Sequence, residues 1–184
     1  MKRNEIRIVG SGGQGVILAT VILAEAAVLA GKYTAQSQSY GPEARGGLCK
    51  AETLIDDRPI GFTKVQNPTL LLALFQTSLN QYAVGLTPEC QVVIDSSLKA
   101  PEILLPKQVI SLPILQTARE VVGRSQTANI VALGVLNELL DIAPADVFRE
   151  AVLKRIPKGT EALNIKALEA GQALAQTWKK EHIA

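Results

Sequence analysis

Aromatic residues and paired cysteines are scarce in this sequence, and their scarcity excludes several classes of function. Aromatic side chains make up 4% of the chain, and the formal net charge of +2 comes without any basic run, so nucleic-acid binding is not expected. Cys49 and Cys90 are isolated and form no C-x-x-C pair. They cannot by themselves make a zinc site or hold an iron–sulfur cluster, and a reducing compartment is indicated.

Groups for acid–base or nucleophilic catalysis are also missing. The only histidine, His182, lies near the end of the chain, where a catalytic role is not expected. The sequence has no G-x-S-x-G elbow, no Walker-type lysine after its glycines, and no His, Cys and acidic cluster at metal-ligand spacing. We therefore predict no catalytic residue and no metal ligand, and a scaffold or binding role for chemistry housed elsewhere.

The N-terminus lacks the apolar segment of a secretory signal. Residues 1–4 run directly into an expected strand, which favours a cytoplasmic protein. With 47% hydrophobic and 20% charged residues among 184, the chain suits one soluble domain that spans residues 1–184.

A glycine-rich turn near the N-terminus is the stretch around which the chain is organised. Gly10, Gly12 and Gly15 fit the G-x-G-x-x-G spacing between an apolar strand and a helix expected over 16–30. Such a turn exposes backbone N–H groups, and the start of the helix adds a dipole, so an anion would be stabilised there. Alternatively, the glycines simply make a close-packed connection, and the spacing alone leaves both possibilities open.

Helix 16–30 is apolar almost all the way round. Glu25 is its only charged residue, whereas an ordinary surface helix keeps a polar face. At about 15 residues the helix is too short to span a bilayer, which needs roughly 20. We therefore expect a sheet on one side and either a partner chain or another element of this chain on the other, with a partner chain favoured.

The residues after the next expected strand, 33–37, argue against NAD. A dinucleotide-binding fold carries an acidic residue there for the ribose hydroxyls. This chain has Gln-Ser-Gln-Ser over 36–39, and its next acid, Glu43, lies beyond Gly41 and Pro42 in a loop. The ribose-binding carboxylate is therefore missing.

The loop 39–47 is the second distinctive stretch. It combines turn-forming residues with Tyr40, Glu43 and Arg45, at the side of the sheet where α/β folds bind ligands. The guanidinium of Arg45 can offer a fork of donors to a carboxylate or phosphate. Alternatively, an ion pair between Arg45 and Glu43 merely shapes the loop.

The remaining pattern predicts an α/β fold that is Rossmann-like, with a mixed, mostly parallel sheet, helices on both faces and a helical C-terminal part. Further strands are expected over 48–55, 60–65, 70–75, 91–95 and 108–112, with 60–65 as the hairpin partner of 48–55. Helices are expected over 78–84, 113–122, 127–140, 144–156 and 160–180.

Two smaller features carry predictions of their own. Asp95 and Ser96 follow an expected strand, where they either face a ligand or, as we favour, cap the next turn. The last helix places an apolar stripe on one face, which predicts docking against a surface. The stripe consists of Leu163, Ala167, Ala170, Leu174 and Trp178.

The glycine turn G-S-G-G-Q-G over 10–15 and the loop Q-S-Y-G-P-E-A-R-G-G over 38–47 together resemble the gamma subunit, or gamma domain, of 2-oxoacid:ferredoxin oxidoreductases. The turn alone is a weak signal, but both motifs in this order are specific. The resemblance covers nearly the whole chain and is least diagnostic after Pro157. The P-E-A-R-G-G form of the loop is more similar to the 2-oxoglutarate and general 2-oxoacid branch than to the pyruvate branch.

The resemblance implies a subunit of a thiamine-diphosphate enzyme that converts a 2-oxoacid, here 2-oxoglutarate, and coenzyme A into an acyl-CoA, CO2 and reduced ferredoxin. Thiamine diphosphate and Mg²⁺ would sit between alpha and beta subunits, and iron–sulfur clusters in other parts, including a ferredoxin-like delta subunit. The resemblance further implies that the gamma subunit packs against this core and helps with coenzyme A. We expect the isolated chain to be inactive and able to self-associate, without binding nucleic acid or membranes.

The resemblance also implies a set of cofactor-binding residues. They are Gly10, Gly12, Gly13, Gln14, Gly15, Ser39, Tyr40 and Arg45, while Gly41, Pro42, Glu43 and Gly46 match the same loop. We hypothesise that the backbone of the turn and the side chain of Arg45 contact coenzyme A or another anion. The competing hypothesis makes the loop 40–47 a docking surface for the alpha subunit.

Two alternatives remain for the chain as a whole. One is the small subunit of indolepyruvate:ferredoxin oxidoreductase, which shares the gamma-type domain. The other, from a different class, is a free-standing nucleotide-binding or regulatory module.

Overall fold

A six-stranded sheet with the strand order β2-β3-β1-β4-β5-β6 forms the centre of the molecule. The computed structural model describes residues 3–40 and 47–182. The strands are β1 Asn4–Ser11, β2 Tyr33–Tyr40, β3 Leu48–Asp56, β4 Leu70–Ala73, β5 Gln91–Asp95 and β6 Val109–Leu112. The helices are α1 Val16–Leu29, α2 Gln76–Tyr82, α3 Ile114–Gln116, α4 Ala128–Leu140, α5 Ala145–Arg155 and α6 Glu161–His182. Short helical turns, η1 Pro106–Gln108 and η3 Ser125–Thr127, and a π-helical segment, η2 Thr117–Val122, complete the chain.

The sheet is mixed and mostly parallel, as predicted. β1, β4, β5 and β6 run parallel, and β3 is antiparallel to both of its neighbours, β1 and β2. The predicted strand over 60–65 is wrong, because 57–69 contains no strand. The hairpin partner of β3 is β2 instead, with Tyr33 opposite Asp56. A period of two residues identifies a strand but does not say which strand it pairs with.

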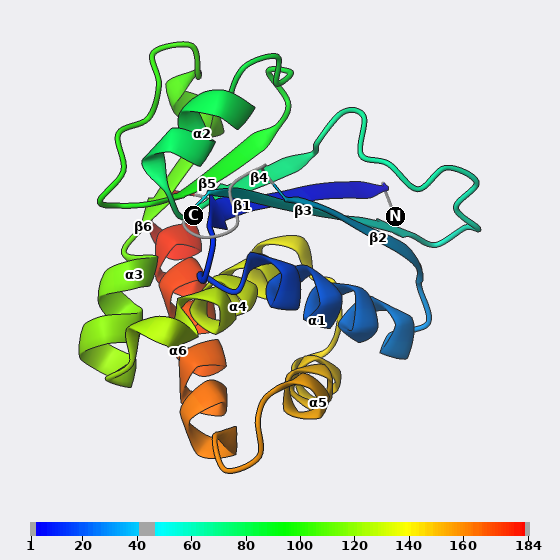
Figure 1. Cartoon of the computed structure of the whole chain (residues 1–184), viewed down its shortest axis with the longest axis vertical. Helices are drawn as coiled ribbons and strands as arrows, with labels where there is room; N and C mark the ends of the chain where they lie inside the picture. The colour runs from blue at the N-terminus through cyan, green and yellow to red at the C-terminus, as the bar shows by residue number, and fades with distance from the viewer. Residues whose placement is uncertain (1–2, 41–46, 183–184) are drawn as a thin grey trace.

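Helices cover the two faces of the sheet unequally (Figure 1). α1, α4, α5 and α6 lie on one face, and α2 lies on the other, against β1, β3 and β4. The larger core cluster joins alternate residues of the strands, such as Ile6 and Ile8, to the helices of the first face. A smaller cluster around Val9, Leu71 and Leu79 lies under α2. The side chains of β1 therefore point alternately into the two layers of the core.

The apolar helix α1 is covered mostly by this chain. It packs against β3, β2 and β1 on one side and against α5 and α4 on the other, and Glu25 forms an ion pair with Arg155 of α5. A partner chain was the favoured expectation for this second side, but α5 and α4 of the same chain cover most of it. Val28 and Leu29, at the end of the helix, remain exposed. Gly31, with a φ of 79°, ends the helix as expected.

The last helix docks through the predicted stripe, and small residues form the centre of its contact with α4. Ala167 is fully buried, and the other stripe residues are partly buried and pack against the core, namely Leu163, Ala170, Leu174 and Trp178. The buried positions also include Asn164, Leu168, Gly171 and Ala175. A Cβ on Gly171 would lie 1.9 Å from the carbonyl oxygen of Val131 in α4, and one on Gly134 would lie 2.1 Å from that of Leu168. The two glycines therefore let α4 and α6 approach closely, a contact that a hydrophobicity pattern does not indicate.

No helix within residues 3–40 and 47–182 is long and apolar enough to cross a membrane.

Candidate functional site

The glycine turn lies at the point in the sheet where the helices that follow two neighbouring strands lie on opposite faces. α1 follows β1 on one face, whereas α2 follows the neighbouring strand β4 on the other. In open α/β sheets this switch point, at the carboxyl ends of the strands, is where ligands bind. The side chain of Gln14 joins the two strand ends: its Oε1 accepts from the N–H of Ser11 at 2.7 Å, and its Nε2 donates to the carbonyl of Leu74 at 3.0 Å. Gln14 therefore holds the shape of the turn.

Glycine is favoured at three positions of the turn, each for a different physical reason. Gly10 is tightly enclosed, because a Cβ there would lie 2.6 Å from Oε1 of Gln14. Gly13 has a φ of 93° with open space around it, so its conformation alone favours glycine. Gly15 combines both reasons, with a φ of 69° and Nδ2 of Asn129 only 2.4 Å from the position of a Cβ. Because Gly15 has no side chain, the start of α4 can lie against the turn, and α1 can pack closely as well.

The start of α1 carries several backbone donors that bond to no other described residue. In the part of the chain that the structure describes, no hydrogen-bond acceptor is found for the N–H groups of Gly13, Val16 and Ile17, and the first bond of the helix runs from Ala19 to the carbonyl of Gly15. Gly15 caps the helix without a side-chain hydrogen bond. These free donors and the helix dipole stabilise a negative charge in front of the turn.

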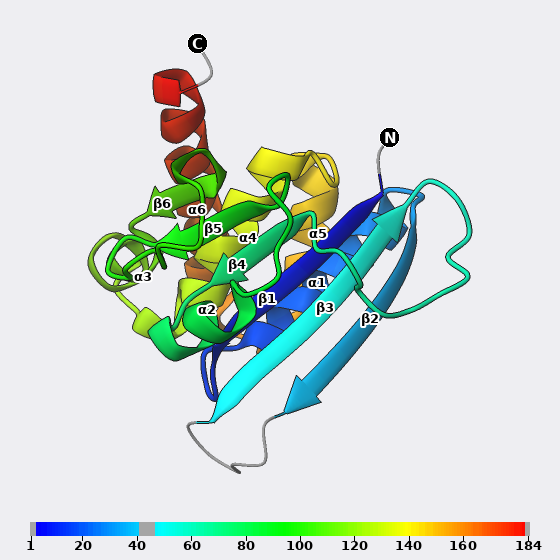
Figure 2. The ribbon, with the colours of Figure 1, turned by 90° about the horizontal axis from the view of Figure 1, so that it is seen from above.

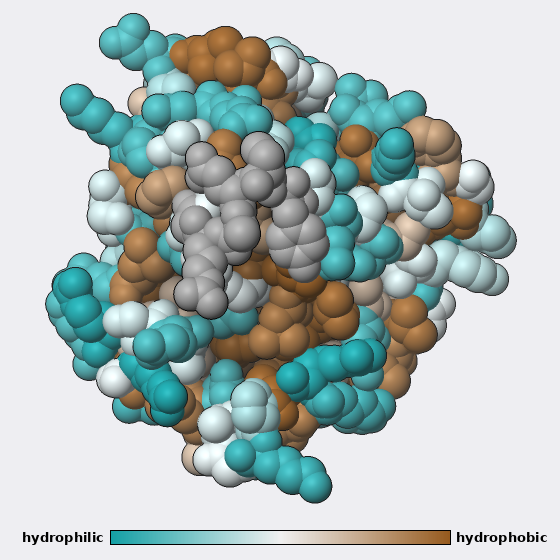
Figure 3. Space-filling view, in the orientation of Figure 1, coloured by the Kyte–Doolittle hydropathy of each residue, from teal (hydrophilic) through white to brown (hydrophobic). Residues whose placement is uncertain are grey.

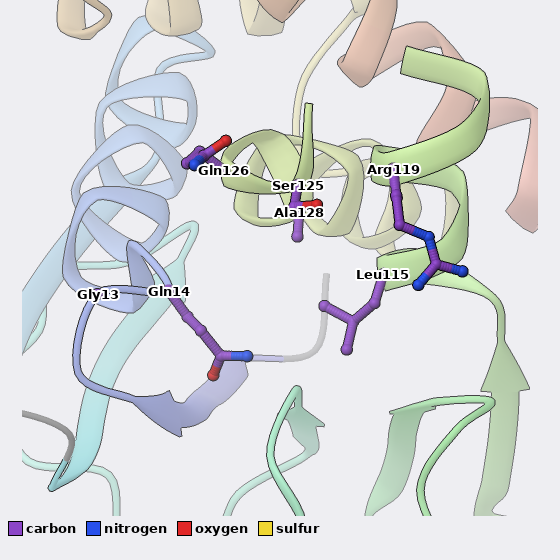
Figure 4. Close-up of a pocket in the computed structure, with 7 residues that line it drawn as sticks. All are labelled: Gly13, Gln14, Leu115, Arg119, Ser125, Gln126 and Ala128. Atoms are coloured by element: carbon purple, nitrogen blue, oxygen red, sulfur yellow. The ribbon is translucent and has the colours of Figure 1, made fainter. Parts of the chain in front are cut away.

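A pocket of about 360 Å³ lies beside the glycine turn. It is lined by Gly13, Gln14, Leu115, Arg119, Ser125, Gln126 and Ala128. Figure 4 shows the glycine turn on one side and Leu115 and Arg119 on the other. The pocket belongs to a face of the molecule that is hollowed and largely apolar over α4 and the start of α1 (Figure 3). A second hollow, of about 200 Å³, shares Gln126 and continues towards α6, so an elongated ligand can follow the surface.

Arg119 comes from the π-helical segment η2, a type of segment that is frequent at functional sites. Its guanidinium donates to Oε1 of Glu120 at 2.7 Å, and this hydrogen bond lowers the pKa of Glu120 below its ordinary value. The side chain remains 67% exposed. No motif in the sequence marks this arginine as a site residue, because 104 positions separate residues 15 and 119 and only the fold brings η2 to the turn.

Asp95 positions the start of the segment that lines the pocket opposite the glycine turn. Its carboxylate is buried, with Oδ1 accepting from the N–H of Ser97 at 2.9 Å and Oδ2 from the N–H of Leu115 at 2.7 Å. The residue therefore ties the end of β5 to the start of α3. Of the two roles considered for Asp95, capping is the one that the structure supports.

The two sequence motifs meet in space. The N–H of Gly12 donates to the carbonyl of Gly47 at 2.9 Å, which joins the glycine turn to the end of the loop 39–47. Ser39 and Tyr40 end β2, two strands away from β1 in the sheet. Arg45, with Gly41, Pro42, Glu43 and Gly46, lies outside the described residues.

The cysteines are placed for packing. Cys49 and Cys90 are both buried, and burial raises the pKa of the Cys90 thiol to about 11 and also raises the pKa of Cys49. Neither thiol is thus ionised to a useful degree at neutral pH. Within residues 3–40 and 47–182, no group of three or more His, Cys, Asp or Glu side chains could hold a metal ion.

Comparison with known proteins defines the class of the chain. The profile of the family described as pyruvate ferredoxin/flavodoxin oxidoreductase matches residues 5–174, and the chain belongs to this family. It is 41% identical to the 2-oxoglutarate synthase subunit KorC of Methanocaldococcus jannaschii, over 95% of both chains. It is 38% identical to the subunit of the same name from Methanothermobacter marburgensis, over 97% of this chain and 100% of that one.

Solved structures agree with this assignment. The gamma subunit of a keto/oxoacid ferredoxin oxidoreductase from Geobacter sulfurreducens superposes with a TM-score of 0.85 at 40% identity, covering 96% of this chain and 98% of that one. A 2-oxoglutarate:ferredoxin oxidoreductase from Magnetococcus marinus, solved with 2-oxoglutarate, coenzyme A and succinyl-CoA, gives 0.86 at 25% identity, with 96% of this chain matching 32% of that one. The predicted gamma subunit of a 2-oxoacid:ferredoxin oxidoreductase, an enzyme of several subunits, is thereby confirmed.

Proposed function

We propose that this subunit serves a complex that oxidises 2-oxoglutarate with coenzyme A to succinyl-CoA and CO2, with ferredoxin as the electron acceptor. The end-to-end match to KorC subunits of 2-oxoglutarate synthases, at 38–41% identity, carries the proposal. Matches to ketoisovalerate and shared pyruvate/ketoisovalerate oxidoreductase subunits are weaker, at 31–34%. Alpha, beta and ferredoxin-like delta partners would hold thiamine diphosphate, Mg²⁺ and the iron–sulfur clusters, with residues 1–184 as one gamma-type unit in the cytoplasm.

The native complex, purified through a tag on this chain, tests the proposal. We expect thiamine-dependent partner subunits to co-purify and ferredoxin to be reduced only when 2-oxoglutarate and coenzyme A are both present. The ratio kcat/KM for 2-oxoglutarate should exceed the ratios for pyruvate, 2-oxoisovalerate and indolepyruvate by about 10-fold to 100-fold. A preference for indolepyruvate would move the chain to the indolepyruvate enzymes. Isolation of a nucleotide-binding monomer without partners would contradict the proposal altogether.

We further propose that the pocket in front of the glycine turn receives a phosphate group of coenzyme A. Gly13 and Gln14, next to the start of α1, line the pocket on one side, and Arg119 lines it on the other. Backbone donors and an arginine fork are the groups with which proteins bind phosphate. Gly10, Gly12, Gln14 and Gly15 would then shape the turn, and Ser39, Tyr40 and Arg45 would contribute from the adjoining loop.

Replacement of Arg119 by glutamine tests this contact in the assembled complex. We expect the KM for coenzyme A to rise about 10-fold to 150-fold, because one charge-assisted hydrogen bond of roughly 1.5–3 kcal/mol is lost. The kcat should change little, and the melting temperature should stay constant because the side chain is 67% exposed. Steady-state kinetics with coenzyme A as the varied substrate measures the effect.

Arg149→Gln is the matched control, since its side chain is 49% exposed, is paired with Glu169 and lies on α5. An equal KM in the Arg119 and Arg149 variants would refute the phosphate contact. The variant Arg45→Ala decides the role of the loop separately. If that complex assembles normally with an unchanged KM for coenzyme A, Arg45 does not contact the ligand.

A further inference from the structure

Two cations share one buried carboxylate on the face of the sheet opposite α1. The carboxylate of Glu52, whose side chain is 7% exposed, lies 2.7 Å from Nε of Arg7 and 3.3 Å from Nζ of Lys50. The ring of Tyr82 in α2 lies 5.8 Å from each cation. The cluster therefore joins β1, β3 and α2, and it carries one positive charge in excess.

The excess charge lies where water cannot easily compensate it. The side chains of Arg7 and Lys50 are only 16% and 25% exposed. A cation that is largely removed from water is costly unless an anion faces it. The nearby carboxylate of Glu5 is occupied elsewhere, because its Oε2 accepts from the N–H groups of Gln66 and Asn67. Among the residues that the structure describes, Glu52 is the only carboxylate that two cations share.

The sheet beside this cluster has no helix over it. In Figure 2, β2 and β3 face the viewer without a helix in front, whereas α1 lies behind them. The register places Ser37 opposite Glu52 and Ser39 opposite Lys50, and directly opposed residues point to the same face. The side chains next to the cluster are therefore short. A sheet face of this kind accommodates another layer of protein.

We propose that this cluster and the adjoining face of β2 and β3 form a docking surface for a partner subunit, and that a carboxylate of that subunit completes the cluster by binding Lys50 and Arg7. The proposal rests on the proposed function insofar as the partner belongs to the oxidoreductase complex. Charge complementarity selects the occupant: the surface offers one uncompensated positive charge on a broad face of short side chains. A small anion would neutralise the charge but leave the serine-lined face uncovered.

The variant Lys50→Met tests the proposal, because it removes the excess charge and leaves the ion pair between Arg7 and Glu52 in place. We expect the affinity of this subunit for the rest of the complex to fall about 10-fold to 100-fold. The melting temperature of the isolated variant should match that of the wild type. Binding of the labelled subunit to complex depleted of it, measured at several salt concentrations, gives both the affinity and its salt dependence. The wild type should lose affinity with salt more steeply than the variant.

Lys158→Met is the control, since this exposed lysine lies between α5 and α6. Equal affinities of the Lys50 and Lys158 variants would overturn the proposal. So would a Lys50 variant that docks normally but binds inorganic phosphate or coenzyme A more weakly, because the occupant would then be a small anion. The wild-type complex assayed in parallel separates the two conclusions: if it assembles and oxidises 2-oxoglutarate, only the docking surface is in question.

Discussion

Replacement of Gly171 by alanine is expected to lower the stability of the protein by about 2 kcal/mol. The new Cβ would lie 1.9 Å from the carbonyl oxygen of Val131 and 3.1 Å from Cα of Gly134. Both are backbone atoms, so no rotamer change relieves the overlap and α4 must move away from α6. Overpacking of this kind costs about 1–3 kcal/mol and occasionally more, against a gain of roughly 0.5–1 kcal/mol from removing a helical glycine.

Thermal unfolding followed by circular dichroism measures this effect, with an expected decrease in Tm of about 4–8 °C. Gly61→Ala is the control, because a Cβ there meets nothing within 4 Å and the residue does not have a positive φ. Its stability should stay within about 0.5 kcal/mol of the wild type. Equal melting temperatures for the two variants would show that the helices do not cross at Gly171.

Replacement of Asp95 by alanine should destabilise the protein by about 3 kcal/mol and weaken coenzyme A binding at the same time. The change leaves the N–H groups of Ser97 and Leu115 without their acceptor in a site where Asp95 is 1% exposed. Each unsatisfied buried donor costs about 1–3 kcal/mol. Leu115 also lines the pocket, so the start of α3 should shift and the KM for coenzyme A should rise.

Urea unfolding and the KM for coenzyme A are the two measurements, and Asp95→Asn gives a graded comparison because its amide retains one acceptor oxygen. We expect about half the loss of stability in that variant. Asp146→Ala serves as a control in the exposed first turn of α5, where a loss of only about 0.3–1 kcal/mol is expected. A fully active Asp95→Ala variant of wild-type stability would contradict the role assigned to this carboxylate.

The strand, turn and helix at the N-terminus could be predicted because each element carries a local signal. Apolar residues mark β1, glycines mark the turn, and Gly31 ends α1 with a φ of 79°. β5, Gln91–Asp95, agrees with the expected range at both ends for the same reason. The partner that covers α1 could not be predicted, because a fully apolar helix only shows that cover is needed. The cover comes mostly from α5 and α4.

The candidate site was predicted only on one side. The glycine turn is visible in the sequence as a spacing, but the opposite wall is built from Leu115, Arg119 and Gln126, which follow no motif. The role of Gly15 was predicted only in part, and Gly171 carried no prediction. Gly15 admits Asn129 of α4, and Gly171 admits Val131, and such close approaches depend on helices that are far apart in the chain. A single sequence does not show these distances.

The topology of the sheet also has a consequence for synthesis. β1 pairs only with β3 and β4, so the first strand to leave the ribosome has no partner until residues 48–56 have followed. α1, apolar around its circumference, waits longer, because its cover in α5 begins at Ala145. At 5–20 residues per second, the interval between the synthesis of α1 and that of α5 lasts roughly ten seconds. The period of greatest risk of aggregation for this subunit therefore falls while it is being made, when a chaperone rather than a partner subunit has to shield α1.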